Sequence, residues 1–434
     1  MPKCSFAKLI LLVSFFTGIG IHAKAQEELH LTLDSARYHA LEYNKNLLNA
    51  GLAVDEADHA LREAIARGLP QLDAAIDYNN FFGSTAEITM GPVPTEIEFN
   101  PTSNLNISVG QLVFSGSYIV GIQTARLFRE ITETSLEKSR LDIKSQVTQS
   151  YYLALVSEES KAIVKQNIEN MKDIQKKTRA MVDAGVAEEV DYDQLSVQVN
   201  MLENSLRAAE RQVELAHNML LLQTGLPADT ELVLTDRLSG FVSETDFHTS
   251  LATPFNLPEN VDYQIMELQE KVAGKQVNLE RASFLPTITG FYNYTEKLLK
   301  PEFDITPNHV IGFNISIPIF SSGMRSARVN QARINHQIAE NQKELLADQL
   351  SIQEKQLRFN LNNAIEQYES QKANLEVAER VFSNLKKKYE QGLVSSLDLT
   401  TANNNYLQAE NSYIQAMIGL LEAQVEMDKL LNSI

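Results

Sequence analysis

Apolar residues recur at alternating steps of three and four along most of this chain. One such seam consists of Leu33, Ala36, Ala40, Tyr43, Leu47, Ala50, Val54, Ala57, Leu61 and Ala64. A second consists of Leu195, Val199, Leu202, Leu206, Ala209, Val213, Ala216 and Leu220. This spacing predicts long helices that pack lengthwise at shallow angles. Residues 118–183 and 325–390 contain no proline, so each is predicted to be one helix about 100 Å long at 1.5 Å per residue.

Four shorter segments alternate between apolar and polar residues, which is the period of a β-strand. These segments are residues 69–79, 104–114, 285–295 and 309–320. In the last of them, every second residue from Ile311 to Ile319 is apolar. Each segment has about ten residues, the length of a tilted strand that crosses a bilayer. The chain therefore combines long helices with four candidate membrane strands.

The landmarks of the chain occur twice in the same order, roughly 210 residues apart. The matching pairs are Leu69-Pro70 with Leu285-Pro286, Val113-Phe114-Ser115 with Ile319-Phe320-Ser321, and Gly185-Val186 with Gly392-Leu393. We therefore predict an internal duplication, with a first repeat at 26–225, a joining segment at 226–258 and a second repeat at 259–434. The proline-containing segments 80–103 and 296–308, between the paired strands, are predicted to be loops.

The first 25 residues have the pattern of a secretory signal peptide. Lys3 and Lys8 give a positive start, an apolar stretch follows, and Ala23-Lys24-Ala25 is a small-x-small cleavage signal. A buried N-terminal helix is the alternative, and the order of charge, apolar core and small residues favours the signal peptide. The mature chain is then exported and begins at Gln26, without Cys4, the only cysteine.

Charge and composition exclude several classes of function. The formal net charge of −18 argues against a nucleic-acid binder, which needs a basic face. The eight histidines show no metal-binding spacing, and no phosphate-binding glycine motif or nucleophile elbow is present. We therefore expect no enzyme, no cofactor and no metal. After the N-terminus, no apolar run approaches the roughly 18 residues that a membrane helix needs.

Four strands cannot close a barrel. An open sheet edge leaves backbone groups unpaired, which lipid does not tolerate. In an exported chain whose four strands each have a polar, lumen-like face, a barrel shared between chains is favoured over a sandwich of ordinary amphipathic strands. Two chains would supply eight strands and three would supply twelve, and the residues alone leave both open.

The chain resembles the TolC family of outer-membrane efflux proteins over nearly its whole mature length. The motifs that carry the resemblance are Leu31-Thr-Leu-Asp-Ser-Ala36 with Asn44-Lys-Asn-Leu47, the two Leu-Pro pairs, Ile317-Pro-Ile-Phe-Ser-Ser-Gly323, and Tyr389-Glu-Gln-Gly-Leu-Val-Ser-Ser-Leu-Asp-Leu399. Lys45 stands where the family usually has proline. The resemblance implies an α+β membrane protein: a trimer with a shared twelve-stranded barrel, four strands from each chain, that continues into a long helical barrel. It also implies that residues 226–258 form an equatorial girdle.

The resemblance also implies a function and its partners. Family members form the exit duct of a tripartite pump or a type I secretion system, in the outer membrane of Gram-negative bacteria and across the periplasm. The implied partners are two further copies of the chain, a periplasmic adaptor, an inner-membrane transporter and outer-membrane lipid. A periplasmic coiled-coil adaptor or structural rod is the alternative, and the four apolar strand faces argue against it.

Two glycine segments interrupt the long helices, and each is predicted to be a helix–helix turn that needs a positive φ. By resemblance, these turns are the periplasmic tip where an adaptor docks, formed by Gly185, Val186, Gly392 and Leu393. The family motif further marks the junctions between strands and helices at Phe114, Pro318 and Phe320.

Three further residues match the family's periplasmic gate. Asp398 matches a ring of acids at the narrow aperture, although an acid near a helix N-terminus is also favoured by the helix dipole. Asp191 and Tyr389 match a pair that forms a hydrogen bond between helices in the closed state. Val394 replaces an arginine that locks the gate in some members, and Thr401 replaces a second aperture acid. The resemblance therefore implies a gate that is looser, or that other contacts lock.

Overall fold

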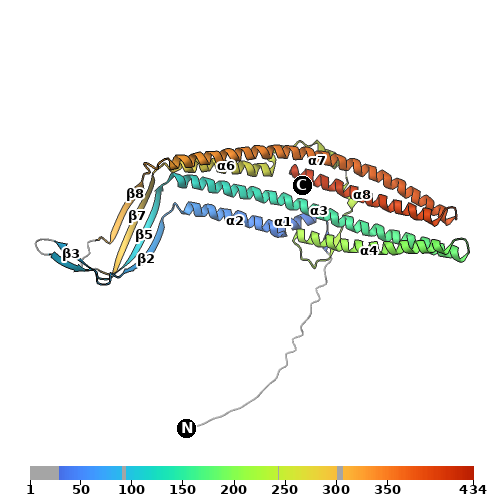
Figure 1. Ribbon diagram of the computed structural model, residues 1–434, viewed down its shortest axis with the longest axis horizontal. Helices are drawn as coiled ribbons and strands as arrows, with labels where there is room; N and C mark the ends of the chain where they lie inside the picture. Colours follow the sequence, from blue (N-terminus) through green and yellow to red (C-terminus); the bar gives the residue numbers. More distant parts are fainter. Residues whose placement is uncertain (1–28, 90–93, 243, 301–305) are drawn as a thin grey trace, which may run out of the picture.

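The computed structural model describes residues 29–434 except 90–93, 243 and 301–305. The protein is elongated, with a four-stranded sheet at one end and two helical hairpins that turn at the other end (Figure 1). The signal peptide predicted at 1–25 lies outside the described residues, as does part of the predicted loop 296–308. None of the described helices is both long enough and apolar enough to cross a membrane.

The same order of elements occurs twice along the chain. The first half contains α1 (Leu33–Tyr43), α2 (Lys45–Ala66), β2 (Gln71–Asn79), β5 (Thr102–Phe114), α3 (Gly116–Asp183) and α4 (Glu189–Thr224). The second contains α6 (Val261–Ala282), β7 (Thr287–Leu299), β8 (His309–Ser316), α7 (Met324–Glu390) and α8 (Ser396–Leu430). The two proline-free segments are single continuous helices, α3 and α7, as predicted.

The main sheet is antiparallel throughout, with the order β2-β5-β7-β8. All four predicted strands are present with shifted ends. The last predicted strand ends at Ser316 rather than at residue 320, because Pro318 has no backbone N–H for a sheet. Ser322 and Gly323 then take φ values of 49° and 82° at the start of α7.

The segment 80–103 is not only a loop. It contains a second antiparallel sheet, formed by β3 (Thr85–Thr89) and β4 (Pro94–Glu98), which projects beyond the main sheet (Figure 1). The prolines of this segment led to the loop prediction. Pro94 is compatible with a strand because it is the first residue of β4, a position where the missing N–H is tolerated.

Side-chain caps start several of the helices. Ser115 accepts a hydrogen bond from the Tyr118 N–H at the start of α3, and Asn260 accepts two at the start of α6. Asn44 caps α2 in the same way, and Lys45 is its first residue. Proline is favoured at this first helical position because the N–H that it lacks has no partner within the helix. The position does not require proline, so lysine can stand there without breaking the helix.

The segment that joins the two halves lies against the middle of the helical body. It contains β6 (Leu232–Leu234), the short 3₁₀ helices η1 (Leu238–Phe241) and η2 (Leu257–Glu259), and α5 (Glu244–Ala252). Strand β6 pairs in parallel with β1 (Leu29–Leu31). Phe247 of α5 is buried against Leu361 of α7 and Leu420 of α8, the two helices of the second hairpin. The Tyr151 hydroxyl of α3 bonds to the Asp236 carboxylate, 2.8 Å away.

Candidate channel wall and tip gate

The two faces of the main sheet differ in chemistry, as the strand register shows. Residues that align across one face include Ile76 with Leu105, Leu72 with Val109, Tyr292 with Ile311, and Ile288 with Ile315. This face is exposed in the single chain: Ile311 is 80% exposed and Phe313 is 73% exposed. An exposed apolar surface of this extent marks contact with lipid or with another protein.

The opposite face of the same sheet is polar and hydrogen-bonded. Asp77 accepts hydrogen bonds from the side-chain amides of Asn104 and Asn106, at 3.0 Å and 2.6 Å. Asn106 in turn accepts a hydrogen bond from the Thr295 hydroxyl at 2.9 Å. The sheet therefore has one largely apolar face and one polar face, the pattern of strands that separate lipid from water.

The junctions between strands and helices are packed by side chains near the two Leu-Pro pairs. Phe114 ends β5, is half-buried and lies opposite Ile288. Pro318 is half-buried, whereas Phe320 is 86% exposed beside the apolar edge of the sheet. The Tyr118 hydroxyl at the start of α3 donates to the Ile65 carbonyl at the end of α2, 2.8 Å away.

The two hairpin turns at the far end of the molecule have the same backbone geometry. Gly185 has φ +72° and Gly392 has φ +70°. In each turn, the N–H of the residue after glycine bonds to a carbonyl five residues earlier, from Val186 to Met181 and from Leu393 to Lys388. This is a Schellman motif, which requires the left-handed conformation that glycine adopts without strain. Val186 and Leu393 are both exposed at the tip, as an adaptor-docking surface requires.

The acids that follow each turn cap the returning helices. Asp191 and Asp398 are the third residues of α4 and α8, and each forms a capping box with the residue before the helix. The Ser395 hydroxyl donates to the Asp398 carboxylate at 2.7 Å. This hydrogen bond is the main reason that the pKa of Asp398 lies below its usual value. Asp398 is exposed and negatively charged near the tip.

Hydrogen bonds and an ion pair connect the two hairpins near their tips. The Tyr389 hydroxyl of α7 bonds to the Thr178 hydroxyl of α3 at 2.7 Å, and both side chains are buried. The Ser396 hydroxyl of α8 donates to the Asp191 carboxylate of α4. Lys177 of α3 forms an ion pair with Glu390 of α7 at 2.9 Å.

Asp191 and Tyr389 were predicted to bond to each other. Asp191 instead bonds to Ser396, and Tyr389 bonds to Thr178. Burial raises the pKa of Tyr389, and the negative charge of Asp191 adds a smaller part to this increase. Val394, at the position of the family's arginine, packs against the apolar core between the hairpins. Thr401 is exposed on α8 and adds no charge.

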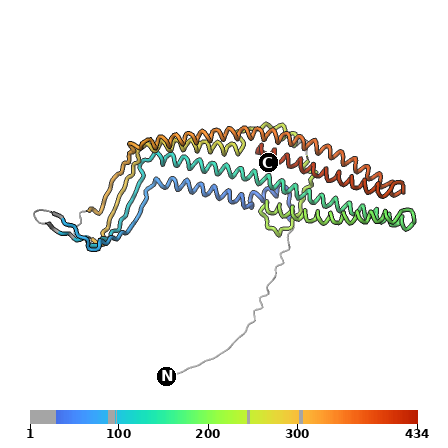
Figure 2. The backbone as a smooth tube through the Cα atoms, viewed as in Figure 1, coloured from blue at the N-terminus to red at the C-terminus, as the bar shows by residue number. Residues whose placement is uncertain are grey.

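Behind these polar contacts, α3, α4, α7 and α8 share an apolar core. It consists of Ile168, Met171, Ile174, Leu195, Val199, Leu202, Phe382, Tyr389, Leu399 and Ala402. The sequence seams predicted part of this core. Thr178, Ser396, Lys177 and Glu390 were missed, because isolated polar residues on a helix carry no periodic signal. Figure 2 shows the two hairpin tips side by side, although more than 200 residues separate Gly185 from Gly392 along the chain.

Comparisons with known proteins agree with this architecture. The family model described as outer membrane efflux protein matches residues 36–226 and 257–433, well over half of the chain. No curated protein matches the chain.

Solved structures share the fold at low sequence identity. The chain is 17% identical to VceC of Vibrio cholerae, with a TM-score of 0.72 over 92% of this chain and 95% of that one. It is 17% identical to the CmeC outer membrane channel of Campylobacter jejuni, with a TM-score of 0.73 over 92% and 85%. The chain is also 17% identical to the open state of the Neisseria gonorrhoeae MtrE outer membrane channel, with a TM-score of 0.72 over 92% of this chain and 88% of that one. The chain belongs to the outer membrane efflux protein family, whose members are channels of the Gram-negative outer membrane and not enzymes, as the sequence predicted.

Proposed function

We propose that three copies of this chain close a twelve-stranded barrel that continues into a helical tunnel and forms the exit duct of an export machine. The observation that carries the proposal is the main sheet, which has one apolar face, one polar face and two free edges, β2 and β8. Free edges cannot remain in lipid, because their backbone groups would lack partners. Pairing β8 of one chain with β2 of the next removes every edge.

The helical part of the chain also has exposed apolar seams on its outermost helices. On α7, one exposed apolar seam follows heptad spacing through Ile334, Ile338, Leu345, Ile352 and Phe359. On α4, a second exposed seam contains Val190, Val197, Met201, Leu215, Met219 and Leu222. Heptad spacing is the pattern with which helices pack lengthwise. The α7 seam lies in the sheet-proximal half of the helical body and the α4 seam in the tip-proximal half (Figure 1), so each seam supports packing against a neighbouring chain at its own level along the body.

We assign the two hairpin tips to a gate and a docking surface. In this assignment, the bonds of Tyr389 to Thr178 and of Asp191 to Ser396 hold the second hairpin against the first in the closed state. Three copies of Asp398 around the axis would form an acidic aperture that favours cations. The exposed turns at Gly185 and Gly392 would receive a periplasmic adaptor, which links the duct to an inner-membrane transporter that supplies the energy.

The substrate class stays broad in this proposal. Small-molecule efflux follows most directly from the family, and type I secretion of polypeptides uses a duct of the same design. The alternative of a periplasmic adaptor or rod is disfavoured, because such a protein does not need a sheet with one largely apolar, exposed face. Cell fractionation separates these proposals: recovery in the soluble periplasm contradicts the channel.

Cysteine cross-linking tests the shared barrel directly. Residues 26–434 contain no cysteine, so introduced thiols have no native competitor. Ala75→Cys in β2 is combined, in separate variants, with Val310→Cys, Gly312→Cys or Asn314→Cys in β8, all on the polar face. We expect oxidation of at least one combination to give a covalent trimer on a denaturing gel.

The matched control is Ser108→Cys with Asn293→Cys, which lie opposite each other in β5 and β7 of the same chain. This pair should give only cross-linked monomers. A ladder that ends at two chains would indicate an eight-stranded dimer instead. The absence of intermolecular products in every β2–β8 combination would contradict the shared barrel.

A further inference from the structure

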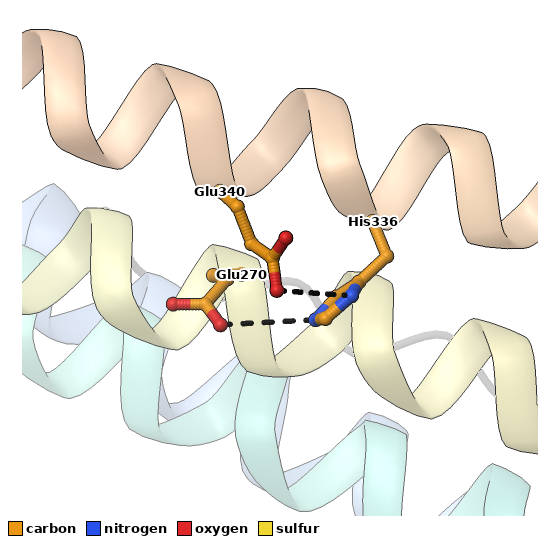
Figure 3. Close-up of side chains that lie close together, drawn as sticks. All are labelled: Glu270, His336 and Glu340. Carbon is orange, nitrogen blue, oxygen red and sulfur yellow. Dashed lines mark ion pairs between the residues drawn. The ribbon is translucent and has the colours of Figure 1, made fainter.

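A cluster of titratable side chains lies between α6 and α7, in the part of the helical body nearer the sheet. Figure 3 shows the imidazole of His336 between the carboxylates of Glu270, from α6, and Glu340, from α7. The three residues each offer one ligand atom, and these atoms lie within 4.8 Å of one another. The sequence did not reveal this group, because Glu270 is far from the other two residues along the chain.

The distances in the cluster are long for hydrogen bonds. His336 Nε2 lies 3.7 Å from Glu270 Oε1, and His336 Nδ1 lies 3.5 Å from Glu340 Oε1. Hydrogen bonds between such atoms are about 2.7–3.2 Å long. Two ligands of one tetrahedral zinc ion, each about 2.0–2.1 Å from the metal, are about 3.4 Å apart. The two carboxylates face opposite ring nitrogens, so an ion bound at one nitrogen takes the carboxylate on that side directly, and the other carboxylate turns toward it within the 4.8 Å that encloses one ligand atom from each residue.

The surroundings orient two of the three ligands. Lys343 pairs with Oε2 of Glu270, which leaves Oε1 directed at His336. Glu270 is only 18% exposed, so its position is well restricted. The missing side chain of Gly274 leaves room for the imidazole, since a Cβ there would lie 3.3 Å from His336 Nε2. His336 and Glu340 are four residues apart and therefore project from the same face of α7.

The charge of the cluster also suits a divalent cation. Two carboxylates and one lysine leave a net negative charge around a neutral imidazole. One imidazole nitrogen with carboxylate oxygens is a ligand set for borderline metals such as zinc, and water completes the shell. Glu340 is 44% exposed and on the surface side, so a small rotation can bring its oxygen to the metal.

From these observations we propose that Glu270, His336 and Glu340 form a binding site for a divalent transition-metal ion such as Zn²⁺, which cross-links α6 to α7. This site is distinct from the tip gate and independent of the number of chains in the barrel. Its expected effect is a stiffer tunnel wall below the sheet.

The test uses the full-length mature protein in detergent, stripped of metal with a chelator and then dialysed. Titration with ZnCl₂ in a calorimeter should show one saturable site per chain, and elemental analysis should recover about one zinc per chain. The thermal unfolding midpoint should rise with added zinc, because the ion binds only the folded protein. His336→Ala and Glu340→Gln should each weaken binding by about tenfold or more. Gly274→Ala should weaken it less, by displacing the imidazole.

His217→Ala is the matched control. His217 Nε2 lies 2.9 Å from Glu158 Oε1, an ordinary hydrogen bond with a single carboxylate, so this variant should bind zinc like the unmodified protein. Circular dichroism and the mass of the assembly show whether each variant is folded. Absence of saturable zinc binding, or unchanged binding in folded His336→Ala, overturns the proposal. A thermal unfolding midpoint that falls in His336→Ala but does not respond to zinc in the unmodified protein identifies a purely structural contact and also overturns it.

Discussion

The turns at Gly185 and Gly392 have the same backbone conformation. The helices that follow them each have aspartate as the third residue, but the two aspartates make different contacts. Asp191 and Asp398 are both the third residue of a helix and both complete a capping box. Only Asp191 also reaches the other hairpin, through the Ser396 hydroxyl. Asp398 bonds to Ser395 beside it and stays exposed. One repeated position thus supplies a contact between hairpins in one copy and a free charge in the other.

This difference shows what a repeat preserves and what it leaves open. Turn and cap geometry depend on a few adjacent residues, so both copies keep them. The contact with the opposite hairpin depends on a residue about 200 positions away, so it can exist in one copy alone. Mutations can separate three roles at the tip: turn geometry, contact between hairpins, and exposed charge.

The largest effect is expected from the turns themselves. Gly392→Val places a β-branched side chain at φ +70°, where the left-handed conformation costs roughly 1–2 kcal/mol. We expect the tip to lose its docking shape while trimers still assemble. Sensitivity to the compounds that become toxic on gene deletion should rise to the level of the deletion strain. Gly185→Val should have the same effect, and Gly51→Ala, in α2 with open space where the added Cβ would lie, should have none. Normal resistance in assembled Gly392→Val would contradict the docking assignment.

The next effect concerns the contacts between the hairpins. The double variant Asp191→Ala, Tyr389→Phe removes the Asp191–Ser396 and Tyr389–Thr178 hydrogen bonds between them, each worth about 0.5–1.5 kcal/mol net. We expect single-channel conductance in planar bilayers to increase several-fold, because the second hairpin is released. Asp398→Ala is the control, since it removes an equivalent cap without a contact between hairpins. An equal increase in the control would assign the effect to capping.

A smaller effect is expected on ion selectivity. Asp398→Asn keeps the shape of the side chain and removes its charge. The reversal potential in a KCl gradient should move toward zero, because the aperture loses negative charge. Asp191→Asn should leave selectivity unchanged while it raises conductance. Unchanged cation preference in Asp398→Asn would remove the acidic aperture from the proposal.

The smallest effect is a dependence on alkaline pH. Burial raises the pKa of Tyr389 above its usual value of 10.0 in the folded chain. A raised pKa contributes stability that is complete below the unfolded value and lost as pH rises through the folded value. The bond to Thr178 should therefore persist from pH 6 to pH 9, and conductance should rise only above about pH 10. Tyr389→Phe should lack this alkaline component; an identical profile in the variant would assign it to other groups.

The sequence predicted the parts of the structure that depend on regular spacing. Seams of apolar residues located α1, α2 and α4, the proline-free segments located α3 and α7, alternation located the four main strands, and glycine located both turns. The small sheet of β3 and β4 was missed, because strands of five residues beside prolines and glycines resemble a loop. The partners of Tyr389 and Asp191 could not be predicted, because they depend on the alignment of four helices at the tip. The neighbours of His336 depend in the same way on how α6 packs on α7.

The free edges of β2 and β8 also have a genetic consequence. In the proposed shared barrel, a chain with one damaged edge can still join a neighbour through its intact edge, but the ring that contains it cannot close. In a cell that makes equal amounts of normal and damaged chains, only about one eighth of rings of three would contain normal chains alone. A mutation at a strand edge should therefore be dominant, whereas a mutation inside a single hairpin tip leaves its neighbours intact.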